Sequence, residues 1–263
     1  MSSCGALVVG TGPNRVLALH GWFGSSAGWG HLLDYIDRDT FSYALVDYRG
    51  YGRRMDVAGD HTMEEISADV LATADALGWE SFDLLGHSMG GMAMQYVLIS
   101  APERVRRLYS ISGVPACGAQ LPDEILAMFS AAPDSFETRM GLTHFGTGQR
   151  LPNAFAHHIA AESQKNSTTE AFRGHLMPWA RGGDISGKVQ GLPHPVKVAV
   201  GQYDPGTNEE STRRTWLEYY PNCEIEVIPN AGHYAMYEAP CWLAASVEEF
   251  LLRPTPEEPT PKN

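Results

Sequence analysis

The chain has 263 residues and a mass of 28.8 kDa, which suits one α/β core without a second domain. Hydrophobic residues make up 43% of the chain and charged residues 19%, a balance that excludes a disordered protein. The formal charge of -12 repels phosphate backbones and anionic lipids, so we expect neither nucleic acid nor a membrane as a partner.

The four cysteines are scattered, and none of them forms the short CxxC pair that zinc or redox sites need. No basic cluster followed by an apolar stretch opens the chain, and no apolar run approaches the roughly 20 residues of a membrane span. We therefore expect free thiols and a cytoplasmic protein. Those cysteines are Cys4, Cys117, Cys223 and Cys241.

Short apolar runs alternate with longer amphipathic runs, which is typical of strands and helices in a mostly parallel sheet. The sequence therefore predicts an α/β fold with an open, mostly parallel sheet flanked by helices. The expected strands are residues 6–9 (at an edge), 16–19, 43–46, 82–85, 105–111, 196–200 and 224–228. The expected helices of the core are residues 63–77, 89–100, 208–219 and 240–252.

Strand signals stop between two predicted strands, and amphipathic segments at 123–131, 154–163 and 169–181 take their place. We expect residues 116–191 to form a helical lid inserted in a core of residues 1–115 and 192–253. Such an insertion would lie over the carboxyl end of the sheet, where open α/β sheets bind ligands. Its aromatic residues, Phe145 and Trp179 among them, are candidates for a substrate pocket, although packing between helices also requires them. Residues 254–263, rich in Pro, Thr and Glu, are expected to form a disordered tail.

Two segments match the nucleophile pattern G-x-S-x-G, one around Ser26 and one around Ser88. Ser88 directly follows a predicted strand and precedes a predicted helix, as the pattern requires. Ser26 follows an irregular Gly-rich segment, and we interpret it as the cap of a helix over residues 29–36. The context therefore selects Ser88 as the nucleophile.

A serine hydroxyl needs an imidazole to accept its proton, and the imidazole needs a carboxylate to orient it. His233 follows the predicted strand 224–228, and Asp204 ends the predicted strand 196–200 within a Pro-Gly turn. Both would therefore lie on the carboxyl side of the sheet, in the chain order Ser, acid, His. Asp184 is the alternative acid, but no strand precedes it.

Acyl transfer also needs donors for the negative charge of the tetrahedral intermediate. The backbone amide of Met89 directly follows the nucleophile, and that of Trp22 lies in the loop after strand 16–19. We expect these two amides to form the oxyanion hole. His20, in the same loop as Trp22, is expected to stabilise that loop.

Several motifs follow one another along the chain: His20-Gly21-Trp22, Asp47-Tyr48-Arg49-Gly50-Tyr51-Gly52, Gly86-His87-Ser88-Met89-Gly90-Gly91, Pro102-Glu103-Arg104-Val105, Asp204 and Ala231-Gly232-His233. Taken together, they resemble the α/β-hydrolase superfamily over nearly the whole chain. The resemblance implies a triad of Ser88, Asp204 and His233, with Asp47 and Arg49 as loop scaffolding.

The resemblance also separates subfamilies. Dehalogenases and epoxide hydrolases of this fold carry Asp at the position of Ser88. Cyanohydrin lyases with a serine triad place Lys directly after the triad His, and many carbon-carbon bond hydrolases of ring-cleavage pathways place Trp there. This chain has Tyr234, which we expect in the pocket wall and which favours the ester over the carbon-carbon bond.

Other chemistry has weaker signals. His158 and Glu162 are four residues apart on a predicted helix but lack a third metal ligand, so a solvated helix face is expected. Arg173 and Arg181 either meet a substrate carboxylate or lie on the surface. Neither a Rossmann glycine motif nor a P-loop is present.

The sequence therefore predicts a serine hydrolase that cleaves an apolar carboxylic ester or lactone through an acyl-enzyme on Ser88, without a cofactor or a metal. It would act on a small molecule as a monomer or homodimer. Two alternatives stay open. One is a carbon-carbon bond hydrolase of a ring-cleavage product, and the other is a ligand sensor that keeps the triad with little turnover.

Overall fold

The computed structural model describes residues 5–254. Cys4 lies outside the described residues, and so do residues 255–263, which are most of the predicted tail. Seven strands form one sheet in the order β1-β3-β2-β4-β5-β6-β7, in which β1 is antiparallel to β3 and the other pairs are parallel. The strands are β1 (Ala6–Val9), β2 (Asn14–Leu19), β3 (Phe41–Val46), β4 (Phe82–His87), β5 (Val105–Ile111), β6 (Val196–Gly201) and β7 (Cys223–Ile228). All seven predicted strands are present.

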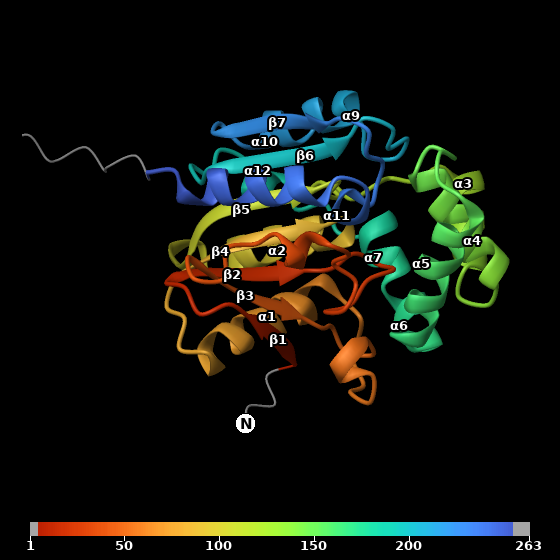
Figure 1. Ribbon diagram of the computed structural model, residues 1–263, viewed down its shortest axis with the longest axis horizontal. Coiled ribbons are helices and arrows are strands. Elements are labelled where there is room, and N and C mark those ends of the chain that lie inside the picture. The colour runs from red at the N-terminus through yellow and green to blue at the C-terminus, as the bar shows by residue number, and fades with distance from the viewer. Residues whose placement is uncertain (1–4, 255–263) are drawn as a thin grey trace, which may run out of the picture.

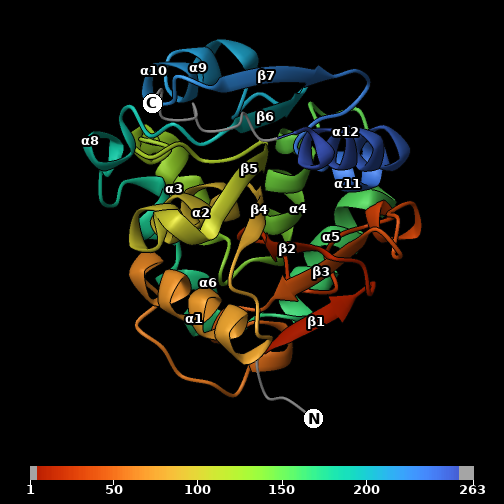
Figure 2. The ribbon, with the colours of Figure 1, turned by 90° about the vertical axis from the view of Figure 1, so that its left-hand side faces the viewer.

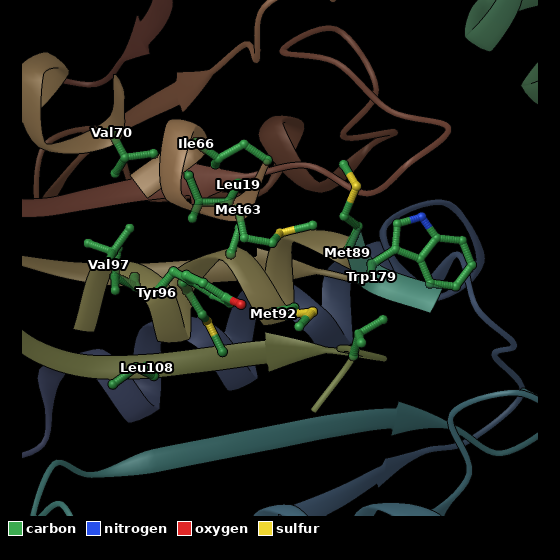
Figure 3. Packing of buried hydrophobic residues seen from close by; sticks show 14 of the residues in the cluster. Leu19, Met63, Ile66, Val70, Met89, Met92, Tyr96, Val97, Leu108 and Trp179 are labelled. Carbon is green, nitrogen blue, oxygen red and sulfur yellow. The ribbon is translucent and has the colours of Figure 1, made fainter. Parts of the chain in front are cut away.

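The central strands are apolar because helices cover both faces of the sheet. Every residue of β3, β4 and β6 is buried, as expected of parallel strands with no solvent-facing side. Figure 2 shows α1 (Met63–Ala76) and α2 (Met89–Ser100) on one face and α12 (Pro240–Leu252) on the other. Figure 3 shows Met92 and Val97 of α2 between α1 and β5, in one buried cluster with Leu108.

Six helices lie between β5 and β6 in the described chain. Figure 1 shows α3 to α7 gathered beyond the arrowheads of β2 and β6, at the carboxyl ends of these strands. Two of them, α4 and the four-residue α8, were not predicted from the sequence. Gly141 and several polar residues obscure the amphipathic pattern of α4. The helices are α3 (Asp123–Ala131), α4 (Phe136–Gly146), α5 (Asn153–Lys165), α6 (Thr169–Gly174), α7 (Leu176–Ala180) and α8 (Ser186–Val189).

Two predicted helices are divided in the structure. Residues 208–219 form α9 (Glu209–Arg213) and α10 (Trp216–Tyr219), because Thr215 leaves the helical conformation with φ -123° and ψ -74°. Residues 169–181 form α6 and α7, where Pro178 cannot donate the backbone hydrogen bond of a continuous helix. Between β7 and α12 lies the short helix α11 (Ala235–Glu238).

The predicted helix over residues 29–36 is wrong. Only a 3₁₀ turn, Leu32–Asp34, forms there. Gly30 has a φ of +54°, a left-handed conformation, and a Cβ on it would lie 2.5 Å from the Met236 carbonyl oxygen. The chain therefore turns sharply where the sequence pattern favoured a helix.

No helix among residues 5–254 combines the length and the apolar character needed to cross a bilayer. The three cysteines in this range, Cys117, Cys223 and Cys241, are free thiols, as predicted.

Candidate active site

Ser88 lies at a strained turn between β4 and α2. Its φ of 53° and ψ of -118° are rarely adopted by residues other than glycine, and its side chain does not cap the helix that it precedes. Its amide donates to the Ile111 carbonyl at 3.0 Å, and its carbonyl accepts from Val114 N at 2.9 Å. The surrounding strands therefore hold the backbone of Ser88 in this conformation.

The glycines on both sides of Ser88 are required by close backbone approach, as the motif predicts. A Cβ on Gly86 would lie 2.5 Å from the Gly90 carbonyl oxygen, and a Cβ on Gly90 would lie 2.1 Å from the Leu19 carbonyl oxygen. Such distances are far below van der Waals contact, so a side chain at either position would displace the backbone.

Asp204 and His233 come together from the ends of β6 and β7, although they are 29 positions apart in the chain. The His233 Nδ1 atom lies 2.7 Å from Asp204 Oδ2, so it carries the proton and leaves Nε2 as the basic nitrogen. The other carboxylate oxygen, Oδ1, accepts from the amides of Gly206 and Thr207 at 2.9 and 3.1 Å. The Thr207 hydroxyl also donates to Oδ2.

Asp204 and His233 each stabilise the charged form of the other, which shifts both pKa values. Burial alone would raise the pKa of Asp204, but His233 and Thr207 hold it well below its usual range. Burial likewise acts to lower the pKa of His233, and the Asp204 carboxylate overcomes this effect and raises it above 6.5. Asp204 is therefore a carboxylate at neutral pH, and His233 is a stronger base than a free imidazole.

The loop after β2 runs directly beside Ser88. A Cβ on Gly21 would lie 3.0 Å from the Ser88 Cβ. Within the described part of the chain, the backbone amides of Trp22 and Met89 donate no hydrogen bond. The Trp22 indole stacks on Phe172 at 3.9 Å and donates to the Phe172 carbonyl oxygen at 2.6 Å, which fixes the loop against the inserted helices.

Two cavities meet at Ser88 and His233. The smaller has a volume of about 90 Å³, and its wall includes Trp22, Phe145, Trp179 and Tyr234. The larger, of about 510 Å³, extends between the loop after β5 and the segment from Pro205 to Trp216. The structure thus brings all three predicted pocket residues, Phe145, Trp179 and Tyr234, to the wall of the smaller cavity.

Ser26 has a different role from the predicted helix cap. Its amide and hydroxyl donate to the two oxygens of Asp47 at 2.6 and 2.7 Å, and both side chains are buried. Asp47 also accepts from the Arg53 amide, so it holds two loops together. Asp184, the alternative acid, is exposed and accepts from the Ser186 amide, away from both cavities.

The remaining candidates lie outside the cavities. Arg173 and Arg181 are paired with Asp134 and Asp123 on the surface, which corresponds to the second of their two predicted roles. His158 is exposed. Among residues 5–254, no group of three or more His, Cys, Asp or Glu side chains is arranged to hold a metal ion.

Arg49 and His20, which were predicted to stabilise loops, each contact neighbouring residues. Arg49 forms ion pairs with Glu65 at 3.1 Å and with Asp69 at 2.9 Å, which anchor its loop to α1. His20 is buried with its Nδ1 atom 2.8 Å from the Gly21 carbonyl oxygen, and its ring packs on Tyr48.

Two residues beside the acid and the base were not predicted from the sequence. Thr207 donates to Asp204 from three residues away, a spacing typical of an Asp-initiated turn that the Asp-Pro-Gly-Thr sequence indicates. His87 is buried with its Nε2 atom 2.9 Å from the His233 carbonyl oxygen. Burial lowers the pKa of His87 to about 3, so this side chain is neutral and Nε2 donates. No local signal indicates that contact, because it joins residues 146 positions apart.

Known proteins with similar sequences are hydrolases of several kinds. "Epoxide hydrolase 3" of Siraitia grosvenorii is 25% identical over 92% of this chain and 93% of its own. A "2-hydroxy-6-oxononadienedioate/2-hydroxy-6-oxononatrienedioate hydrolase" of Paraburkholderia phymatum is 26% identical over 87% of this chain and 84% of its own. "Pimeloyl-[acyl-carrier protein] methyl ester esterase" of Klebsiella pneumoniae is 29% identical over 94% and 96%.

The fold has close counterparts among solved structures. A bromoperoxidase from Bacillus anthracis superposes with a TM-score of 0.84 at 17% identity, over 94% of both chains. The family model described as "alpha/beta hydrolase fold" matches residues 14–240, which span the sheet from β2 to β7 and include Ser88, Asp204 and His233. The chain therefore belongs to the alpha/beta hydrolase family.

Proposed function

We propose that the protein is a serine hydrolase that cleaves a neutral carboxylic ester or lactone through an acyl-enzyme on Ser88. The observation that carries this proposal is the shared cavity wall: Ser88 on its strained turn and His233 held by Asp204 line the same two cavities. A nucleophile, an oriented base and an apolar space beside them are the parts that ester cleavage needs.

In the proposed mechanism, His233 Nε2 takes the proton of the Ser88 hydroxyl as Oγ attacks the ester carbonyl carbon. The amides of Trp22 and Met89, which have no other acceptor in the described chain, stabilise the resulting oxyanion. His233 then gives the proton to the leaving alcohol. Water, activated by His233, attacks the acyl-enzyme and releases the carboxylic acid.

The composition of the cavities favours a neutral substrate. Neither Lys nor Arg occurs among the described residues that line them, and the one carboxylate there belongs to Asp204. A dienedioate, the substrate type named for one group of relatives, carries two carboxylates that would find no cation in these walls. An ester with apolar groups avoids this cost, which is why we place ester hydrolysis before carbon-carbon bond cleavage.

We further propose that residues 116–191 act as a lid that selects the substrate. Phe145 and Trp179 come from α4 and α7 and line both cavities, whereas Ser88, Asp204 and His233 lie in the core. The volume of about 510 Å³ in the larger cavity suits a substrate with an extended or bulky apolar group.

The test combines covalent labelling with turnover. A fluorophosphonate should label wild-type protein rapidly and should not label Ser88→Ala, which should also lose at least about a thousandfold of kcat on nitrophenyl esters. A series of esters of graded chain length then defines the substrate. Rapid cleavage of a ring-fission diketone beside weak turnover of every ester would contradict the ester proposal. Labelling without turnover of any substrate would instead support a ligand sensor.

A further inference from the structure

The loop that carries the proposed base is held by a second carboxylate. We propose that Glu238, paired with Arg150 of the inserted segment, is a positioning residue for His233, an inference that rests on the proposed function. Asp204 orients the imidazole ring, and Glu238 fixes the main chain from which that ring projects.

Glu238 lies on α11, five residues after His233, and its side chain is only 2% exposed. Its Oε1 atom accepts a hydrogen bond from the amide of Tyr234 at 3.2 Å and lies 3.2 Å from where a Cβ on Gly232 would be. The carboxylate is therefore in contact with the residues on both sides of His233. A rotation of the His233 backbone would break this contact.

Arg150 brings the inserted helices to the same point. It follows α4, and its guanidinium donates to Glu238 Oε2 at 3.2 Å and to the Asn230 carbonyl oxygen at 3.1 Å. The guanidinium also lies 4.2 Å from the centre of the Tyr203 ring, and Tyr203 directly precedes Asp204 in the chain. One side chain thus joins the loops of the base and the acid to the segment after α4.

A backbone hydrogen bond reinforces this connection. The amide of His233 donates to the carbonyl oxygen of Gly146, the last residue of α4, at 2.9 Å. A Cβ on Gly146 would lie 3.1 Å from the His233 Cβ, so the end of α4 packs directly against the base. The inserted segment therefore contributes to the position of His233 as well as to the cavity wall.

The charge of Glu238 also acts on His233. Burial raises the pKa of Glu238, and the amides of Gly232 and Tyr234 together with the Arg150 guanidinium oppose that rise. The carboxylate in turn helps to raise the pKa of His233. The other titratable groups that face His233 are Asp204, His87 and Tyr234. Removing the charge of Glu238 should therefore lower the pKa of the base.

The test compares Glu238→Gln and Arg150→Met with wild-type protein, using a nitrophenyl ester and a small fluorophosphonate. We expect each variant to lose on the order of 10- to 100-fold of kcat and of the labelling rate, with KM little changed, because misplacement of the base slows acylation rather than binding. In Glu238→Gln, the rise of kcat/KM with pH should also move to lower pH. Arg150→Lys should recover part of the loss.

Glu249→Gln is the matched control, because Glu249 of α12 forms an exposed ion pair with Arg253. This substitution should leave every rate unchanged. The double variant of Arg150 and Glu238 should be no slower than the worse single variant if the two act as a unit. Rates and a pH profile equal to wild type in Arg150→Met and in folded Glu238→Gln would overturn the inference. If Ser88→Ala retained activity in the same assays, the proposed function itself would fail instead.

Discussion

The hydrogen bonds around Asp204 predict the effect of Asp204→Asn. An asparagine has one oxygen and one NH₂ group where the aspartate has two acceptors. The Oδ1 position faces the amides of Gly206 and Thr207, which can only donate, so the asparagine oxygen must occupy it. The NH₂ group then faces His233 Nδ1. Two donors cannot bond to each other, so the imidazole must move its proton to Nε2 and lose its function as a base.

The magnitude follows from these contacts. Returning the proton to Nδ1 in this variant would break the hydrogen bond from the asparagine NH₂ group to Nδ1 and leave two buried donors facing each other, at a cost of about 3 to 6 kcal/mol. Each 1.36 kcal/mol is worth about tenfold in rate. We therefore expect kcat to fall by about 10²- to 10⁴-fold, while the fold is preserved because the amide fits the space of the carboxylate.

Burst kinetics with a nitrophenyl ester measure the acylation step directly, and thermal unfolding checks that the variant is folded. Asp184→Asn provides the matched control, since Asp184 is exposed and touches neither cavity. A folded Asp204→Asn enzyme that kept acylation within about tenfold of wild type would refute the proposed role of the carboxylate.

His233, Ser26 and Phe145 each carry a further testable prediction. Asp204 raises the pKa of His233, and only neutral His233 can accept a proton, so kcat/KM should rise with pH to a plateau with its midpoint above 6.5. A midpoint below that value would contradict the contact between Asp204 and His233. Ser26→Ala should lower the free energy of unfolding in urea by about 1 to 3 kcal/mol, because the buried carboxylate of Asp47 loses a donor, with kcat unchanged. Phe145→Ala should shift the preferred ester towards larger groups in a chain-length series while small fluorophosphonates still label Ser88, and an unchanged preference would remove Phe145 from the pocket.

The sequence by itself determined the sheet and the nucleophile turn, because their signals are local. Buried parallel strands need continuous apolar runs, and the seven predicted strands are all present. Neighbouring residues were also enough to distinguish Ser88 from Ser26, since only Ser88 has a predicted strand before it and a predicted helix directly after it. The backbone conformation of Ser88 agrees with that choice.

The positions of Asp204 and His233 were partly predictable as well. Residues that end neighbouring parallel strands meet at one edge of the sheet, whatever the length of chain between them. Chain order and strand ends therefore brought the two side chains to the same place, and the structure adds the bond of 2.7 Å and the two amides that fix the carboxylate.

Only the tertiary structure decided how the inserted helices meet this edge. The spacing of apolar residues shows that a helix has a buried face, but it does not show which surface that face contacts. The Arg150 contact with Glu238 spans 88 residues, and the Ser26 contact with Asp47 joins two loops. Each depends on the packing of segments with independent local patterns, so no spacing within either segment encodes it. For the same physical reason, only the tertiary structure shows the cavity beside Ser88, because residues of α3, α4 and α7 form part of its wall.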